Sequence, residues 1–139
     1  MVAAVVLCDS IHTDSTSGKH SLLGCFSLIR FPSFPAAAPP FHLYVVVTGA
    51  RCTEEQPMEV RVRITDADQK AVLFDLAGRI GPCDPLSHYE LVCEVEGVEF
   101  TAPGPYVVQI LADGTPVAER RLPVVEAPGA AVRTKAGQA

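Results

Sequence analysis

The sequence of 139 residues contains no tryptophan and no cluster of basic side chains. Its eleven Lys and Arg are scattered, and sixteen Asp and Glu give a net charge of −5 at pH 7. Nucleic-acid-binding proteins neutralise phosphates with grouped cations, so nucleic acid is not an expected partner. No apolar run approaches the roughly 20 residues that a membrane-spanning helix needs. The sequence therefore predicts neither a nucleic-acid-binding nor a membrane-spanning protein.

Closely spaced cysteine pairs are also absent. The five cysteines, an odd number without a Cys-x-x-Cys pair, are Cys8, Cys25, Cys52, Cys83 and Cys93. This spacing favours reduced thiols over a disulfide framework. The apolar start of the chain lacks the basic residues and the length of an export signal. Together these features predict a cytoplasmic protein.

The sequence does contain enough apolar material for one core. Apolar residues make up 48% of the chain and charged residues 19%, as in folded domains that need no disulfide or metal to fold. After Val125 the chain becomes small and polar, without an apolar period. We therefore predict one domain at residues 1–125 and a flexible C-terminal tail at 126–139.

Alternation of apolar and polar residues predicts half-buried strands in the C-terminal half. Met58 to Thr65 places four apolar side chains on one face, and His88 to Glu96 repeats the pattern. Tyr106 to Ile110 alternates again, and Asp113-Gly114 then predicts a tight hairpin turn before a returning strand. A second hairpin is predicted where the polar turn 66–70 leads into an apolar run.

The spacing of these turns predicts the fold class. Short strands separated by regular turns are typical of a sandwich or barrel. Arg120 falls on the inward face of the last predicted strand, which predicts a β-bulge near Arg120 and Arg121. The predicted fold is all-β: an antiparallel, immunoglobulin-like β-sandwich of about seven to nine strands.

The N-terminal half is apolar with little alternation. Val2 to Cys8, Leu22 to Ile29 and Phe41 to Val47 read as strands that are covered on both faces. Two covers remain open: the proline-rich segment 31–40, which would cross the surface in an extended form, or a second copy of the protein.

Apolar residues on otherwise polar faces indicate an interface. Val107 and Leu111 point away from the core side of their predicted strand, and Tyr44 and Val46 belong to an apolar N-terminal strand. Such residues are typical of a covered surface. The sequence therefore predicts a non-enzymatic interaction or assembly module, whose partner is another protein or a second copy in a homo-oligomer.

A polar segment from residue 9 to residue 20 gives the alternative function. Asp9, His12, Lys19 and His20 would bind a small ligand or metal from a surface loop. Their spacing matches no recognised set of metal ligands. The glycine-lysine pair before His20 also lacks the following Ser or Thr of a phosphate-binding loop. The main prediction therefore includes no metal and no cofactor, and the alternative is a small-ligand-binding or metal-binding sandwich.

No catalytic residues are predicted. Cys8 with His12, or Cys93 with His88, would supply a thiol and a base. Cys93 falls on the inward face of its strand and His88 on the opposite face, so these two side chains diverge. Cys8 has no orienting acid or oxyanion donor nearby in sequence. The expected protein is not an enzyme.

Three groups of residues form motifs along the chain. They are Leu7-Cys8-Asp9 with Gly18-Lys19 and Leu22 to Phe26; Phe34-Pro35; and Phe100, Pro103, Gly104 and Tyr106 with Asp113-Gly114, Leu122 and Val124. Together they resemble a family of small bacterial cytoplasmic proteins of unknown function. The resemblance covers most of Val2 to Val125 and implies no activity.

The segment from Pro103 to Tyr106 has a separate resemblance. It is similar to the corner before a late strand in immunoglobulin-like and fibronectin-like sandwiches. There a tyrosine buries its ring while its hydroxyl bonds back to nearby backbone. The expectation for this chain is the same role for Tyr106.

Overall fold

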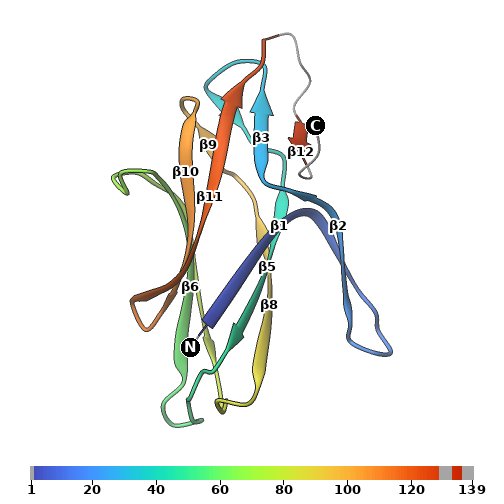
Figure 1. The fold of residues 1–139 in the computed structure, drawn as a ribbon, viewed down its shortest axis with the longest axis vertical. Coiled ribbons are helices and arrows are strands. Elements are labelled where there is room, and N and C mark those ends of the chain that lie inside the picture. The colour runs from blue at the N-terminus through green and yellow to red at the C-terminus, as the bar shows by residue number, and fades with distance from the viewer. Residues whose placement is uncertain (1, 129–132, 136–139) are drawn as a thin grey trace.

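The computed structural model describes residues 2–128 and 133–135, which fold into twelve β-strands (Figure 1). The strands form a four-stranded sheet, a six-stranded sheet and a two-stranded ribbon. The all-β class is confirmed, with more strands than the predicted seven to nine. No helix in the described residues is long and apolar enough to cross a membrane.

Sheet A has the strand order β2-β1-β5-β8, with every neighbouring pair antiparallel. Its strands are β1 (Val2–Thr13), β2 (His20–Phe26), β5 (Phe41–Thr48) and β8 (His88–Val95). Several large side chains of β1, β2 and β5 that face sheet B are fully or almost fully buried, among them Leu7, Phe26, Leu43 and Val45. This face forms one half of the hydrophobic core.

Sheet B has the strand order β12-β3-β11-β10-β6-β7. Its strands are β3 (Leu28–Phe31), β6 (Met58–Asp66), β7 (Val72–Ile80), β10 (Gly104–Ala112), β11 (Thr115–Glu126) and β12 (Arg133–Lys135). β3 and β11 run parallel, so the prediction of a purely antiparallel fold is wrong at this pair. β12 lies within the predicted tail, of which residues 129–132 and 136–139 are outside the described residues.

Both predicted hairpins are confirmed. Asp113 and Gly114 join β10 to β11 with φ values of 47° and 82°, the positive values that a two-residue hairpin turn of this kind requires. The polar turn 67–71 joins β6 to β7. The bulge lies elsewhere than predicted, because the register of β10 and β11 shifts at Ile110/Leu111, opposite Val117.

Arg120 faces inward, and hydrogen bonds rather than a bulge accommodate it. Its Nη1 donates to the carbonyl oxygen of Val5 in β1 at 2.8 Å, and its Nη2 donates to Oγ of Ser27 at 3.0 Å. Ser27 is the single residue between β2 and β3, where the chain passes from sheet A to sheet B. Arg120 therefore ties the two sheets together along this side of the sandwich.

The proline-rich segment covers one end of the core. Within it β4 (Ala36–Ala37) pairs with β9 (Glu99–Phe100), and the Phe34 ring packs edge-on against Phe31. On the outer face of sheet A, Ala4 stays exposed and Val46 stays half-buried. Of the two covers considered for the N-terminal strands, the proline-rich segment therefore does not shield this outer face.

Tyr106 adopts the predicted corner. Its hydroxyl donates to the carbonyl oxygen of Ala102 at 2.7 Å, and its ring lies edge-on to Phe100 with centroids 4.8 Å apart. The side chain is buried. The role expected of Tyr106, a buried ring with its hydroxyl bonded to nearby backbone, is therefore confirmed.

The bonds of Arg120 predict a specific loss of stability. Arg120→Ala removes two hydrogen bonds from a charged donor and leaves the Val5 carbonyl without this partner, so we expect the free energy of unfolding to fall by about 2 kcal/mol. Urea unfolding measures the change. Arg51→Ala is the control, because Arg51 is exposed and lies outside the strands, and it should change stability by less than about 1 kcal/mol. Equal losses would contradict the role assigned to Arg120.

Candidate functional site

The sandwich is open on the side away from Arg120. Sheet A ends there at β8 and sheet B ends at β7, and within the described residues no strand pairs with the outer edge of either. Only residues 81–87 join the two strands, at one end. Backbone N–H and C=O groups along these edges are therefore available to pair with another strand.

An apolar groove of about 180 Å³ lies between β7 and β8. Its lining is contributed by three strands: Val60 and Val62 from β6, residues 76–80 from β7 and residues 91–93 from β8. Leu76 is 49% exposed and Val92 46% exposed, and Leu86 in the connecting segment is 99% exposed. Among the described residues, five large hydrophobic side chains are exposed, and three of them lie along this open side: Leu76 on the inner face of β7, Val92 on the outer face of β8 and Leu86 in the connection between them. The opening is thus the main concentration of exposed apolar surface.

β7 is apolar but almost entirely unburied. Its sequence is Val-Leu-Phe-Asp-Leu-Ala-Gly-Arg-Ile, and only Ile80 is buried. Proteins normally protect exposed edge strands with charged side chains, proline or a bulge. β7 contains no proline and only two charged side chains, Asp75 and Arg79, and its one register irregularity lies near its start, opposite Thr65. An exposed apolar edge of this kind is typical of a surface that another chain covers.

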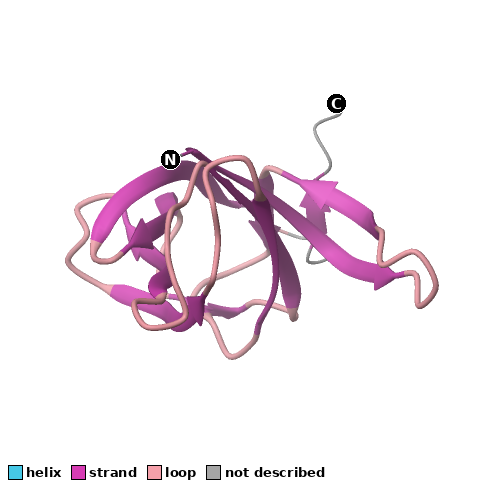
Figure 2. Cartoon of the chain, turned by 90° about the horizontal axis from the view of Figure 1, so that it is seen from below, coloured by secondary structure: helices cyan, strands magenta, loops and turns pink. Residues whose placement is uncertain are grey.

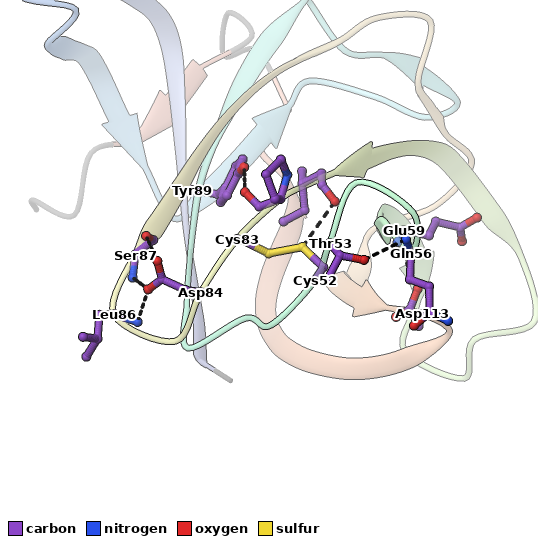
Figure 3. Close-up of a disulfide and its surroundings, with 12 residues drawn as sticks. Cys52, Thr53, Gln56, Glu59, Cys83, Asp84, Leu86, Ser87, Tyr89 and Asp113 are labelled. Carbon is purple, nitrogen blue, oxygen red and sulfur yellow. Dashed lines mark hydrogen bonds between the residues drawn. A yellow bond between two sulfur atoms is a disulfide. The ribbon is translucent and has the colours of Figure 1, made fainter.

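A disulfide fixes one end of the groove (Figure 3). It joins Cys52, between β5 and β6, to Cys83, between β7 and β8, and the backbones of the same two residues exchange hydrogen bonds of 3.0 and 2.9 Å. The Tyr89 hydroxyl donates to the Pro82 carbonyl at 2.6 Å. The carboxylate of Asp84 accepts from the N–H of Leu86 at 2.8 Å. These bonds hold the connection between β7 and β8, which includes Leu86, in a defined turn.

The disulfide corrects the prediction of five reduced thiols. Cys52 and Cys83 are 31 residues apart in sequence and meet only because two connections lie side by side at the same end of the sandwich. The odd number of cysteines concealed this pair. The argument from reduced thiols for a cytoplasmic location therefore now depends on three cysteines alone, Cys8, Cys25 and Cys93.

The carboxylate of Glu90 joins three strands on the outer face of sheet A. It accepts a hydrogen bond of 2.6 Å from the Tyr44 hydroxyl, and Nε2 of His20 and of His88 lie 3.4 and 3.3 Å from it. The bond from Tyr44 is the main cause that lowers the pKa of Glu90, and the same bond raises the pKa of Tyr44. Nδ1 of His20 is 2.8 Å from Oγ1 of Thr13.

This cluster anchors the β1–β2 hairpin, which projects from the sandwich (Figures 1 and 2). His20 and Tyr44 were predicted for two different sites, a ligand loop and an interface, and the structure brings them together. Neither side chain is exposed. Through their contacts with Glu90, both residues have a structural role: they connect β2, β5 and β8.

The predicted ligand loop is mostly strand. β1 continues to Thr13 and β2 begins at His20, so only residues 14–19 form a turn. Within that turn the carboxylate of Asp14 accepts from Ser17 Oγ at 2.6 Å and from the N–H of Thr16 at 3.2 Å. The bond from Ser17 is the largest cause that lowers the pKa of Asp14. The polar groups of the turn therefore bond mainly to one another.

The other predicted ligands are spread along the hairpin. The carboxylate of Asp9 lies against Gly24, whose φ of 69° and missing side chain leave it room. His12 and Lys19 are exposed. Across the described residues, no group of three or more His, Cys, Asp or Glu side chains is arranged to hold a metal ion. The alternative ligand site therefore has no common centre.

The predicted interface on β10 is covered by the chain itself. Val107 and Leu111 are only 6% and 7% exposed. Val107 is paired with Arg121 and Leu111 with Arg61 on the flanking strands. Long arginine stems cover apolar neighbours in this way. These two residues are thus unavailable to a partner, whereas Tyr44 and Val46 are half-buried on the outer face of sheet A.

The two thiols considered as nucleophiles, Cys8 and Cys93, are poorly suited to nucleophilic attack. Cys8 and Cys93 are both buried, and desolvation is the main cause that raises the pKa of each thiol. A raised pKa keeps the thiol protonated and unreactive at neutral pH. His88, the base considered for Cys93, instead lies beside Glu90.

A larger cleft of about 460 Å³ lies at the other end of β7. The β6–β7 turn and the corner before Tyr106 form its walls, which include the acidic residues Asp66, Asp68 and Glu99. Asp66 accepts hydrogen bonds from the backbone N–H groups of Lys70 and Ala71. One of its three carboxylates therefore closes the turn.

Comparison with protein-family models gives a match over most of the chain. Residues 3–125 match the model of a family described as a family of unknown function, DUF6941. No curated protein matches the chain.

The disulfide predicts the number of titratable thiols. Protein purified without reductant and unfolded in denaturant should show three thiols, and five after reduction. Replacing both Cys52 and Cys83 by alanine removes a link across 31 residues, and should lower the free energy of unfolding by roughly 3 to 4 kcal/mol. Cys25→Ala, which removes a thiol but no link, is the control. Five thiols before reduction would contradict the pairing.

The lowered pKa of Glu90 predicts a dependence on pH. A carboxylate whose pKa is lower in the folded state stabilises the fold above its ordinary value of 4.5, and this contribution is lost as pH falls through the lowered value. Glu90→Gln should therefore show a smaller loss of stability between pH 6 and pH 3 than the parent protein. Urea unfolding at both pH values checks this, with Glu119→Gln as an exposed control. An unchanged difference would argue against the cluster.

Proposed function

The chain belongs to DUF6941, a family of unknown function, and on that premise we propose that it is a non-enzymatic protein-interaction module. Its partner binds along the open side of the sandwich, over the groove between β7 and β8. The observation that carries this proposal is the exposure of Leu76 on the groove side of β7, whose outer edge, like that of the facing strand β8, has no strand partner in the described residues.

The form of the groove favours an extended protein segment over a small molecule. Its volume of about 180 Å³ is below the roughly 300 to 1,000 Å³ of most small-molecule pockets. Both of its long sides are strand edges with unpaired backbone groups. An added strand satisfies such groups by hydrogen bonds, while alternate side chains enter the apolar groove. The groove thus offers both parts of strand recognition.

The alternative function, binding of a small ligand or metal through Asp9, His12, Lys19 and His20, has weaker support. His20 is engaged with Glu90 and Thr13, and Asp9 lies against Gly24. The turn that carries Lys19 closes on itself through Asp14. Ligand binding at this hairpin would first have to break these contacts.

Two finer features are also proposed. An immunoglobulin-like character of the C-terminal half is supported by the corner at Tyr106. A bacterial, cytoplasmic origin is supported by the resemblance of the motifs at Leu7 to Asp9 and at Phe100 to Tyr106. Three of the five cysteines are free thiols, and these three also support the cytoplasmic location.

Site-specific photocrosslinking tests the interaction. A photoreactive amino acid in place of Leu76 or Leu91 should give a covalent adduct with a protein in the native cell, because both residues line the groove from its inner side. The same amino acid in place of Leu23, which is 56% exposed on β2, is the control and should give little adduct. Mass spectrometry then identifies the captured chain. Absence of an adduct at both groove positions would refute the proposed function.

A further inference from the structure

We propose that the occupant of the open side is a second copy of this chain. The two copies pair through β7 in an antiparallel arrangement about a two-fold axis at Ala77, which joins the two B sheets into one. The inference rests on the proposed function, because it names the partner at the same edge. Its evidence is the self-complementary pattern of charge, size and space along β7.

The charges of β7 match when the strand meets itself. In an antiparallel pair centred on Ala77, residues equally distant from the centre lie opposite each other. Asp75 of one copy then faces Arg79 of the other, and the pair occurs twice. Both side chains lie on the outer face of sheet B, like Ala77, because alternate residues share a face.

Other centres give poorer pairings. Outward-pointing backbone groups alternate along an edge, so a strand that pairs with itself is centred on a residue. A centre at Asp75 places two carboxylates opposite each other, and a centre at Arg79 places two guanidinium groups opposite each other. Directly opposed like charges destabilise a sheet. Centres at Leu76 and Gly78 leave both charges facing uncharged residues.

The inner face is complementary in size. The same register places Leu76 opposite Gly78 and Phe74 opposite Ile80. Leu76 is 49% exposed, and no atom lies within 4 Å of the position that a Cβ on Gly78 would occupy. The open space above Gly78 can therefore receive Leu76 of the second copy, which buries apolar surface on both chains.

The two charged groups are also available. Arg79 is exposed, and among the described residues no hydrogen bond or ion pair engages its guanidinium. Asp75 Oδ1 accepts from Arg61 Nη1 at 2.7 Å, but Oδ2 lies 3.9 Å from Arg63 Nη2, beyond hydrogen-bond distance. Oδ2 therefore retains capacity to accept from Arg79 of the second copy.

Charge reversal with complementation tests this pairing. Sedimentation or light scattering over a concentration series should show a dimer for the parent protein. Arg79→Asp and Asp75→Arg should each raise the dimer dissociation constant at least tenfold, because each creates two like-charge pairs. Mixing the two variants restores opposite charges at both positions and should restore the dimer. Arg51→Asp, an exposed charge reversal outside β7, should leave the dimer intact.

The outcomes separate this inference from the proposed function. Rescue on mixing supports the pairing and also shows that both variants are folded. A parent protein that stays monomeric at all concentrations, or variants that dimerise as well as the parent, would overturn it. If the photoreactive residue at Leu76 then captures a different protein, the proposed function stands without self-pairing. If it captures nothing, both fall.

Discussion

The hydrogen bond from Arg120 to the Val5 carbonyl crosses from one sheet to the other, and the rest of the architecture follows from which side it closes. Arg120 also donates to Ser27, at the residue where the chain leaves sheet A for sheet B. On this side, therefore, the two sheets are joined both by the chain itself, at Ser27, and by the hydrogen bonds of Arg120. On the opposite side, within the part of the chain that the structure describes, the comparable links lie at one end, in the Cys52–Cys83 disulfide and the Tyr89–Pro82 hydrogen bond. The two sheets are therefore linked on the Arg120 side, whereas on the β7–β8 side they are linked at one end.

This asymmetry explains where apolar surface is covered and where it remains. β10 lies between β6 and β11, and residues from both neighbours cover Val107 and Leu111 on its outer face. β7 has a neighbour on one side only, and its inner face extends beyond the reach of sheet A. A short apolar strand is thus covered by neighbouring strands of the same chain at β10 but is left exposed along one edge at β7. Position in the sheet decides between the two, more than composition does.

The same difference between local sequence pattern and position in the fold decides which features could be predicted from the sequence. Alternation and the Asp113-Gly114 turn predicted the β6, β8 and β10–β11 strands, because these signals are local. The burial of Val107, the parallel pairing of β3 with β11 and the disulfide depend on contacts between residues far apart in sequence. The Asp9 to His20 segment misled because its polar residues suggested a loop, whereas an extended hairpin has room for them on its exposed faces. The groove was missed for a related reason: no local pattern shows which strand ends a sheet.

β10 has a further consequence for how the domain opens. Its backbone is paired along both edges, and residues 106–112 are buried on both faces. Amide hydrogens in such a strand exchange with solvent only when the whole domain unfolds, whereas an edge strand or a projecting hairpin exchanges through local opening. The protein therefore carries an internal reporter of global unfolding at β10 and a reporter of local motion at β7. Protection that appeared at β7 alone would show that its edge had become covered.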